Sequence, residues 1–94
     1  MRARWTREAR AQLQRQVRYL AERNQQAADR LYVDARAAAD LIVRHPEFGR
    51  RIDPRVREWG VGKDKRYVLR YVAKVVVVEI VEFWHTAQDR PLAA

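Results

Sequence analysis

The stretch YVLRYVAKVVVVEIVEFW, residues 67–84, decides the fold that the sequence predicts. Along residues 67–72, large apolar side chains alternate with a row of arginine and valine, which is the two-residue period of a β-strand. A second run over residues 75–84 is still richer in valine and aromatic residues, which favour strands. Only Ala73 and Lys74 separate the two runs, so they are expected to pair through a tight hairpin, although this linker lacks the Gly or Asn that such turns prefer.

In the N-terminal part of the chain, the apolar residues recur with the period of an α-helix. Over residues 7–22 the apolar side chains lie on one helical face, at Ala9, Leu13, Val17 and Leu20. Thr6 is a typical N-cap residue, and the residues up to Trp5 can form a short first strand. The helix is expected to end at residues 23–25, because Asn24 tolerates the left-handed conformation that ends many helices.

A second helix is predicted to follow directly. Its apolar positions alternate in steps of three and four residues, at Ala28, Leu31, Ala35, Ala38 and Ile42. His45-Pro46 ends the pattern, because the residue before a proline disfavours the helical conformation. Two long helices with so short a connection must pack antiparallel, and the small alanines let the two backbones approach closely.

A loop over residues 46–54 is expected to lead into a further strand at about residues 56–61. The predicted order is therefore strand, helix, helix and three strands, or βααβββ. We predict an α+β fold in which an antiparallel helix hairpin packs on a small, mainly antiparallel sheet. The 94 residues suffice for one compact domain, so residues 1–94 are expected to form a single domain.

The last predicted strand is apolar on both faces. Two alternating sets of side chains line it, Val76, Val78, Ile80 and Trp84 on one face and Val75, Val77, Val81 and Phe83 on the other. Two helices can cover only one side of a sheet, so a partner protein laid across the sheet would explain the second apolar face. A strand buried on both faces within its own domain would explain it equally well.

The composition bounds the possible functions. The net charge is +8, and the excess of basic residues lies before Tyr71. Such a charge attracts nucleic acid, an acidic protein segment or both. A solvated arginine-rich surface without a binding role would have the same composition. The absence of cysteine excludes disulfides and thiolate metal sites, and the two separated histidines have no metal-ligand spacing. No apolar leader or membrane-spanning stretch is evident. A cytoplasmic protein without metal, cofactor or membrane partner is expected.

Local signatures in the same order resemble the ParE branch of the ParE/RelE toxin superfamily over nearly the whole chain. The stretches that carry the resemblance are Trp5-Thr6 with Ala9 and Leu13, Tyr19-Leu20-Ala21-Glu22-Arg23-Asn24, Ala27-Ala28, His45-Pro46-Glu47-Phe48-Gly49-Arg50, Val56-Arg57-Glu58, Tyr67-Val68-Leu69-Arg70-Tyr71 and Trp84-His85-Thr86-Ala87-Gln88-Asp89-Arg90-Pro91. The fourth of these is similar to the family's Pro-x-x-Gly-Arg loop. No single stretch is specific, but their order and spacing together favour the family.

The resemblance implies the toxin of a type II toxin-antitoxin pair, held in a hetero-oligomer by a cognate antitoxin whose acidic or amphipathic segment wraps it. ParE-like members poison DNA gyrase and have no catalytic centre, whereas RelE-like members cut mRNA in the ribosomal A site. The tail after His85 lacks the tyrosine that RelE-like enzymes often carry, which favours a gyrase toxin that is not an enzyme. A ribosome-dependent mRNA interferase is the alternative, and a basic nucleic-acid-binding module is a third.

Three sets of candidate residues follow. An RNase needs cations for the phosphorane and groups that move protons, for which the sequence offers Arg57, Arg70, His85 and Arg90. Target or anion binding is expected at Arg57, Lys65, Arg66 and Arg70. The antitoxin is expected to cover one face of the last strand, at Val76, Val78, Ile80 and Trp84. His85 can instead be a structural anchor at the end of that strand.

Overall fold

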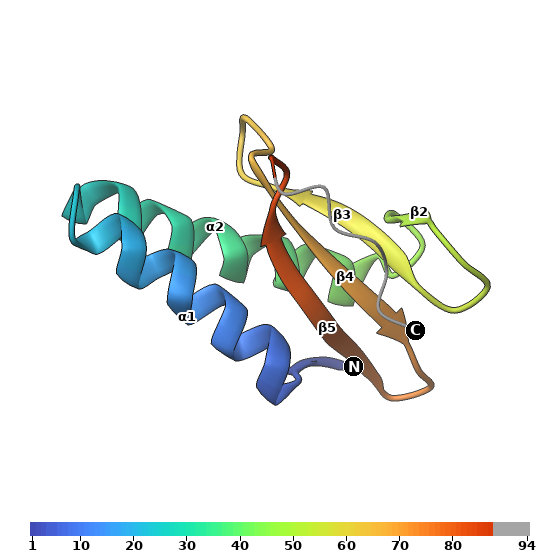
Figure 1. Cartoon of the computed structure of the whole chain (residues 1–94). Helices are drawn as coiled ribbons and strands as arrows, with labels where there is room; N and C mark the ends of the chain where they lie inside the picture. Colours follow the sequence, from blue (N-terminus) through green and yellow to red (C-terminus); the bar gives the residue numbers. More distant parts are fainter. Residues whose placement is uncertain (88–94) are drawn as a thin grey trace.

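The structure is a computed structural model that describes residues 1–87 of the chain. Its elements in chain order are β1 (Arg2–Trp5), α1 (Arg7–Ala21), α2 (Gln25–Arg44), β2 (Arg50–Arg51), β3 (Arg57–Val61), β4 (Tyr67–Ala73) and β5 (Val77–His85). Figure 1 shows two layers, with the hairpin of α1 and α2 on one side of the sheet. The predicted α+β fold is confirmed, and the short β2 is an additional strand. The single domain over residues 1–94 stays a prediction.

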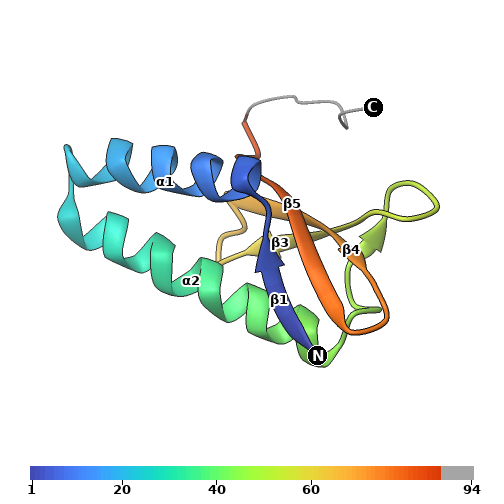
Figure 2. The same cartoon turned by 90° about the horizontal axis from the view of Figure 1, so that it is seen from below.

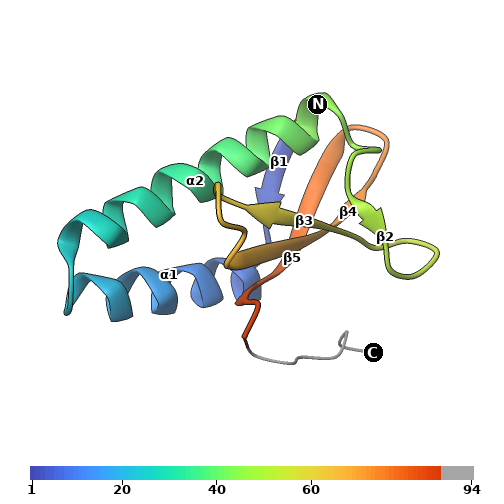
Figure 3. The same ribbon diagram turned by 90° about the horizontal axis from the view of Figure 1, so that it is seen from above.

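The first and the last strand of the described chain lie side by side in the sheet. Its strand order is β1-β5-β4-β3-β2, so β5 lies between β1 and β4. β1 pairs with β5 in parallel, and the other pairs are antiparallel. The end of the helix hairpin where α1 connects to α2 extends beyond the sheet in all views. β1 is in front of the sheet when the molecule is seen from below (Figure 2), and the β3–β4 loop is in front when it is seen from above (Figure 3). Among residues 1–87 no helix combines the length and the apolar character that crossing a bilayer requires.

Both helices begin at a side-chain cap. The Thr6 hydroxyl accepts a hydrogen bond from the Ala9 N–H at 3.1 Å, as predicted. Asn24 was predicted to end the first helix in the left-handed conformation, and this prediction is wrong. Its backbone is extended (φ −160°), and its side chain caps α2 by accepting from the Ala27 N–H at 3.2 Å. The physical reason is that the first N–H groups of a helix lack partners inside the helix, so a short polar side chain stabilises a helix start.

The helices and the sheet share one apolar core. On the helices it consists largely of small side chains, at Ala9, Ala28, Ala35, Ala38 and Ala39. Tyr71 on β4 is the largest fully buried side chain. Its hydroxyl donates to the Pro46 carbonyl at 2.6 Å and accepts from the Gly49 N–H at 2.9 Å, so it ties the loop after α2 to the sheet. Burial raises the pKa of Tyr71, which keeps the hydroxyl protonated and able to donate.

The turn between β4 and β5 lies further along the chain than predicted. Lys74, Val75 and Val76 form it, and the Lys74 N–H donates to the Val77 carbonyl at 2.8 Å. Ala73, predicted to be in the turn, is the last residue of β4. Val75 and Val76 are 92% and 73% exposed, so they are not part of a buried strand. A three-residue connection does not require the Asn-Gly pair of a two-residue turn, which agrees with the absence of those residues.

A β-bulge interrupts the pairing of β4 with β5. Arg70 pairs with Glu82, whereas the next residue, Tyr71, pairs with Ile80. Val81 is therefore an extra residue on β5, opposite no residue of its own. One inserted residue shifts the alternation of side chains by one position, so the faces of β5 exchange across the bulge.

This exchange overturns the predicted faces of the last strand. Val78 and Ile80 before the bulge and Phe83 after it all lie in the core beneath the helices, with at most 1% of each residue exposed. Trp84 lies on the other side of the sheet, over Arg70. The prediction that Val78, Ile80 and Trp84 share one face is wrong, because strict alternation does not hold across an inserted residue.

Candidate functional site

A line of charged side chains crosses the open face of the sheet, which is the side turned away from α1 and α2. Glu58 on β3, Arg70 on β4 and Glu82 on β5 are neighbours in the strand register. The Arg70 Nε donates to Glu58 at 2.9 Å, and its Nη1 donates to Glu82 at 3.1 Å. Arg50 on β2 adds a second cation to Glu58 at 3.1 Å. The open face therefore carries a chain of alternating charges that compensate one another.

Arg70 is buried within this chain of charges. Only 8% of its side chain is exposed, and its guanidinium carbon lies 4.5 Å from the centroid of the Trp84 ring. Trp84 is also buried, and its indole N–H has no hydrogen-bond partner among residues 1–87. A buried charge is tolerated only when it is paired, so the two carboxylates both hold Arg70 in position and neutralise it. An anion that approached Arg70 would meet the negative charge of Glu58 and Glu82 as well.

Arg57 does not lie beside Arg70, although target or anion binding was expected at both. Arg57 pairs in register with Tyr71, whose ring lies in the core, whereas Arg70 points to the open face. The Arg57 Nη1 donates to the carbonyls of Glu47 at 3.1 Å and Gly49 at 2.8 Å. Arg57 therefore stabilises the loop after α2, on the opposite side of the sheet from Arg70.

Lys65 and Arg66 lie in the loop between β3 and β4. Lys65 has a left-handed backbone (φ 55°), and its ammonium lies 5.5 Å from the centroid of the Trp59 ring. Arg66 forms an ion pair with Asp64 at 3.0 Å. The four predicted anion-binding cations thus occupy three separate places, and target binding by each of them stays a prediction.

His85 is the last residue of β5 and is partly exposed. Its Nδ1 accepts a hydrogen bond from the Ala87 N–H at 2.9 Å, and its ring meets Tyr67 edge-on with centroids 4.9 Å apart. Both contacts are those of a structural anchor. Arg90, the fourth residue of the predicted RNase set, lies outside the described residues. Within residues 1–87 no group of three or more potential ligands could hold a metal ion.

The four residues expected to contact an antitoxin are separated by the fold. Val76 is exposed in the turn before β5, and Trp84 is buried on the open face. Val78 and Ile80 are 0% exposed, because the side chains of the helices cover them. The structure therefore corrects this set: Val78 and Ile80 cannot contact a partner while the core is intact.

Two features were missed by the sequence prediction. Glu82 was not recognised as a partner of Arg70, because the bulge that aligns them has no local signature. Two grooves flank the helix hairpin, with volumes of about 890 and 910 Å³, and their depth depends on how the helices pack. The one signal in the sequence for such a groove was that Arg10 and Arg18 border the apolar stripe of the first helix.

Comparisons with known proteins agree with this architecture. The model of a family described as "ParE toxin of type II toxin-antitoxin system, parDE" matches residues 3–90. A solved structure described as "Chromosomal ParDE TA system from P. aeruginosa" is similar with a TM-score of 0.75 and 19% sequence identity, over 90% of this chain and 95% of that chain. At this identity the likeness shows the fold alone. No curated protein matches the sequence.

Proposed function

Because the chain belongs to the ParE toxin family of type II toxin-antitoxin systems, we propose that it inhibits DNA gyrase by binding, without a catalytic centre of its own. A cognate antitoxin holds the toxin in an inactive hetero-oligomer in the cytoplasm. Family membership supports the toxin role. The preference for gyrase over the ribosome rests on the chemistry of the open face.

The neutralised state of Arg70 is the observation that carries this proposal. Cleavage of RNA by its own 2′-hydroxyl passes through a phosphorane, which an enzyme stabilises with uncompensated positive charge. Arg70 already donates to Glu58 and to Glu82, both of which are largely buried beside it. A scissile phosphate would have to displace two carboxylates from their charged partner. This arrangement supports a structural role for Arg70.

The other residues of the predicted RNase set do not converge with Arg70 either. Arg57 pairs in register with Tyr71 and His85 pairs with Tyr67, and both tyrosines pack toward the helices. These partners are four residues apart on β4, which corresponds to about 13 Å along a strand. A general acid or base must lie within hydrogen-bond reach of the atom that it serves. The spread of these residues supports binding rather than catalysis.

Two parallel reactions test the target. In the first, the purified chain is added to gyrase, relaxed plasmid and ATP; we expect loss of supercoiling and the appearance of cleaved DNA trapped on the enzyme. In the second, the chain is added to ribosomes that carry a programmed mRNA, and we expect no cleavage. Codon-positioned mRNA cuts that disappear in a His85→Ala variant would overturn the proposal in favour of the interferase. Binding of the plasmid by the chain in a reaction without gyrase would instead indicate a nucleic-acid-binding module.

The antitoxin part of the proposal has its own test. The cognate antitoxin, which we expect to be a small acidic protein encoded immediately upstream, is purified at full length and added to the gyrase reaction at increasing ratios. We expect supercoiling to recover as a complex of the two proteins forms, measured by light scattering after size-exclusion chromatography. Recovery without complex formation would contradict direct neutralisation.

A further inference from the structure

The hairpin formed by β2 and β3 extends beyond the other strands of the sheet (Figure 1, Figure 3). We call residues 50–58 the arginine arm. Its loop is closed by a bond from the Ile52 N–H to the Val56 carbonyl at 2.9 Å. The Asp53 carboxylate accepts from the N–H groups of Arg55 and Val56 at 2.7 and 2.8 Å, which holds the pKa of Asp53 below its ordinary value. The carboxylate therefore stays ionised at neutral pH, and these bonds give the arm a defined shape.

Two exposed arginines give the arginine arm its free positive charge. Arg51 and Arg55 are both exposed, and neither forms an ion pair with any residue between 1 and 87. The neighbouring Arg50 is already paired with Glu58 at 3.1 Å. The Asp53 oxygen that accepts from the loop backbone serves the shape of the loop. The arm therefore presents two guanidinium groups to a partner outside the chain.

A third arginine lies directly opposite Arg51. Arg51 pairs in register with Arg57, so their side chains leave the same face of the β2–β3 hairpin with Cβ atoms about 5 Å apart. Like charges at such a position destabilise a strand pair. The Arg57 guanidinium donates to two main-chain carbonyls, which carry no net charge to cancel its own. Repulsion that is retained at the expense of stability is expected of a binding site, where a bound anion relieves it.

The composition of the arginine arm favours a nucleic-acid backbone over an acidic protein. The centre of a protein interface is built from apolar and aromatic side chains. None of the large apolar side chains that are exposed within the described residues 1–87 lies in the arm. The nearest one along the chain is Phe48, which stacks on His45 with ring centroids 4.5 Å apart. Phosphate groups require only charge and N–H donors, which arginine supplies in a planar fork.

We propose that the arginine arm contacts the phosphate backbone of the double-stranded DNA that gyrase holds, an inference that rests on the proposed function. Arg51 and Arg55 bind phosphate groups, while the rest of the toxin binds the gyrase protein. The chain then binds gyrase that carries DNA more tightly than gyrase alone. This preference directs the toxin to the state of gyrase in which DNA can be trapped.

Two phosphate contacts are too few to hold free DNA. Proteins that make many more such contacts bind DNA non-specifically with a Kd of only about 10⁻⁴–10⁻⁶ M. When gyrase holds both the toxin and the DNA, the same contacts become intramolecular and act at an effective concentration of about the millimolar range. Each phosphate contact adds about −0.9 to the slope of log affinity against log salt, so the arm should add about −2.

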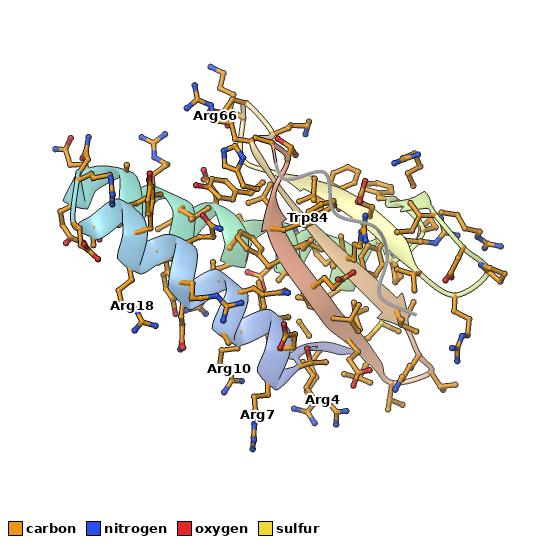
Figure 4. The ribbon with its side chains drawn as sticks, viewed as in Figure 1. Arg4, Arg7, Arg10, Arg18, Arg66 and Trp84 are labelled. Atoms are coloured by element: carbon orange, nitrogen blue, oxygen red, sulfur yellow. The ribbon has the colours of Figure 1, made fainter. Side chains whose placement is uncertain are left out.

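The first test reverses the charge of the arginine arm. We compare Arg51→Glu/Arg55→Glu with the control Arg7→Glu/Arg10→Glu, since all four residues are exposed and both pairs change the net charge equally. Figure 4 shows Arg7 and Arg10 projecting from α1 away from the sheet. If the arm variant unfolds at a lower temperature than the unchanged chain, Arg51→Gln/Arg55→Gln replaces it, because this variant removes the charge and keeps a long side chain.

The affinity of each chain is measured for gyrase alone and for gyrase saturated with a linear DNA duplex. Fluorescence anisotropy is read from a label on Gln26→Cys, which is possible because the chain has no cysteine of its own. Gln26 is exposed at the start of α2, at the opposite end of the molecule from the arm (Figure 1). We expect the unchanged chain and the control to prefer gyrase with DNA by about tenfold or more. The arm variant should lose this preference to within about threefold, and its salt slope should fall by about two.

Three results would contradict the inference in different ways. Retention of the full preference by the arm variant would show that the arginines do not contact DNA. An equal loss of affinity with and without DNA would place the arm against the gyrase protein instead. Failure of the unchanged chain to bind gyrase in either state would overturn the proposed function, and this inference with it.

The second test locates the arginine arm directly. A photo-crosslinker is attached to Pro54→Cys at the exposed tip of the arm or, as a control, to Gln26→Cys. Each chain is irradiated with end-labelled duplex in the presence and in the absence of gyrase. We expect a crosslink to DNA from position 54 that requires gyrase, and none from position 26. Crosslinks from position 54 to gyrase subunits only, or to DNA equally well without gyrase, would overturn the proposal.

Discussion

The side chain of Gln12 on α1 accepts a hydrogen bond from the backbone N–H of Phe83 on β5, with 2.7 Å between Oε1 and N. β1 pairs with β5 only as far as Ile80, so among residues 1–87 the part of β5 around Phe83 has no strand neighbour on that side. Gln12 is 3% exposed and takes the place of a strand partner, while its amide nitrogen donates to Glu8 at 3.2 Å. A buried polar residue on the apolar face of α1 thus fastens the helix layer to the bulged strand.

Replacement of Gln12 by alanine is expected to destabilise the fold by about 1–3 kcal/mol, because the buried Phe83 N–H loses its acceptor. Urea denaturation followed by circular dichroism measures the change. Gln14→Ala is the matched control, since Gln14 is exposed on the same helix, and it should alter stability by no more than about 0.5 kcal/mol. Equal effects of the two substitutions would show that the bond to Phe83 contributes nothing.

Replacement of Arg70 by alanine is expected to destabilise the protein by about 3–5 kcal/mol, because Glu58 and Glu82 would remain buried together without their shared cation. Thermal unfolding measures the loss. Any loss of toxicity in this variant should then follow the fraction of unfolded protein at the assay temperature.

A compensating variant separates this role of Arg70 from a direct role in target binding. Adding Glu58→Gln and Glu82→Gln to Arg70→Ala removes the unpaired carboxylates and should recover much of the lost stability. If the triple variant is as stable as the unchanged chain but no longer inhibits gyrase, Arg70 contacts the target and the structural explanation is wrong.

Replacement of Tyr71 by phenylalanine is expected to cost about 1–3 kcal/mol, because the Pro46 carbonyl loses its donor and the Gly49 N–H loses its acceptor. Hydrogen exchange provides a local measurement. The Gly49 amide should exchange much faster in the variant, while the amide of Leu69 in the middle of β4 changes in proportion to global stability. An unchanged Gly49 amide would contradict the anchoring role of the hydroxyl.

Glu79 is expected to make stability depend on pH. Hydrogen bonds from Arg4 and from Lys74 hold the pKa of this carboxyl below its ordinary value. A lowered pKa in the folded state stabilises the protein above the unfolded pKa, and this contribution is lost as pH falls through the folded value. Glu79→Gln should therefore be less stable by about 0.2–1 kcal/mol at neutral pH, since both cations are exposed. Urea titrations should show the difference vanishing in strong acid; a difference independent of pH would contradict the assignment.

Local residue patterns predicted most of the fold. The spacing of apolar residues by three and four positions predicted both helices to within a few residues, and the alternation of side chains from Tyr67 onward predicted β4. These periods follow from backbone geometry alone. The resemblance to ParE toxins is confirmed by the family match over residues 3–90. Asn24 was misassigned because a short polar residue suits either the end of one helix or the start of the next, and only the observed backbone conformation distinguishes the two.

The candidate site was predicted less well, because its residues depend on strand register. Arg57 and Arg70 were expected in the same candidate sets, but the pairing of the strands directs them to opposite sides of the sheet. Val78 and Ile80 were expected to meet a partner, but the helices cover them. The two grooves that flank the helix hairpin were not predicted at all, since a groove is a property of two packed surfaces.

The sequence by itself determined the two helices, the strands other than β2, their order and the family, since each depends on the residues within one segment or on their succession along the chain. The tertiary structure decided which side chains meet. The extra residue at Val81 set the register that joins Arg70 to Glu82 and moved Trp84 to the open face. Such contacts join residues far apart in the chain, so their positions follow from the packing of the whole domain and not from any local period.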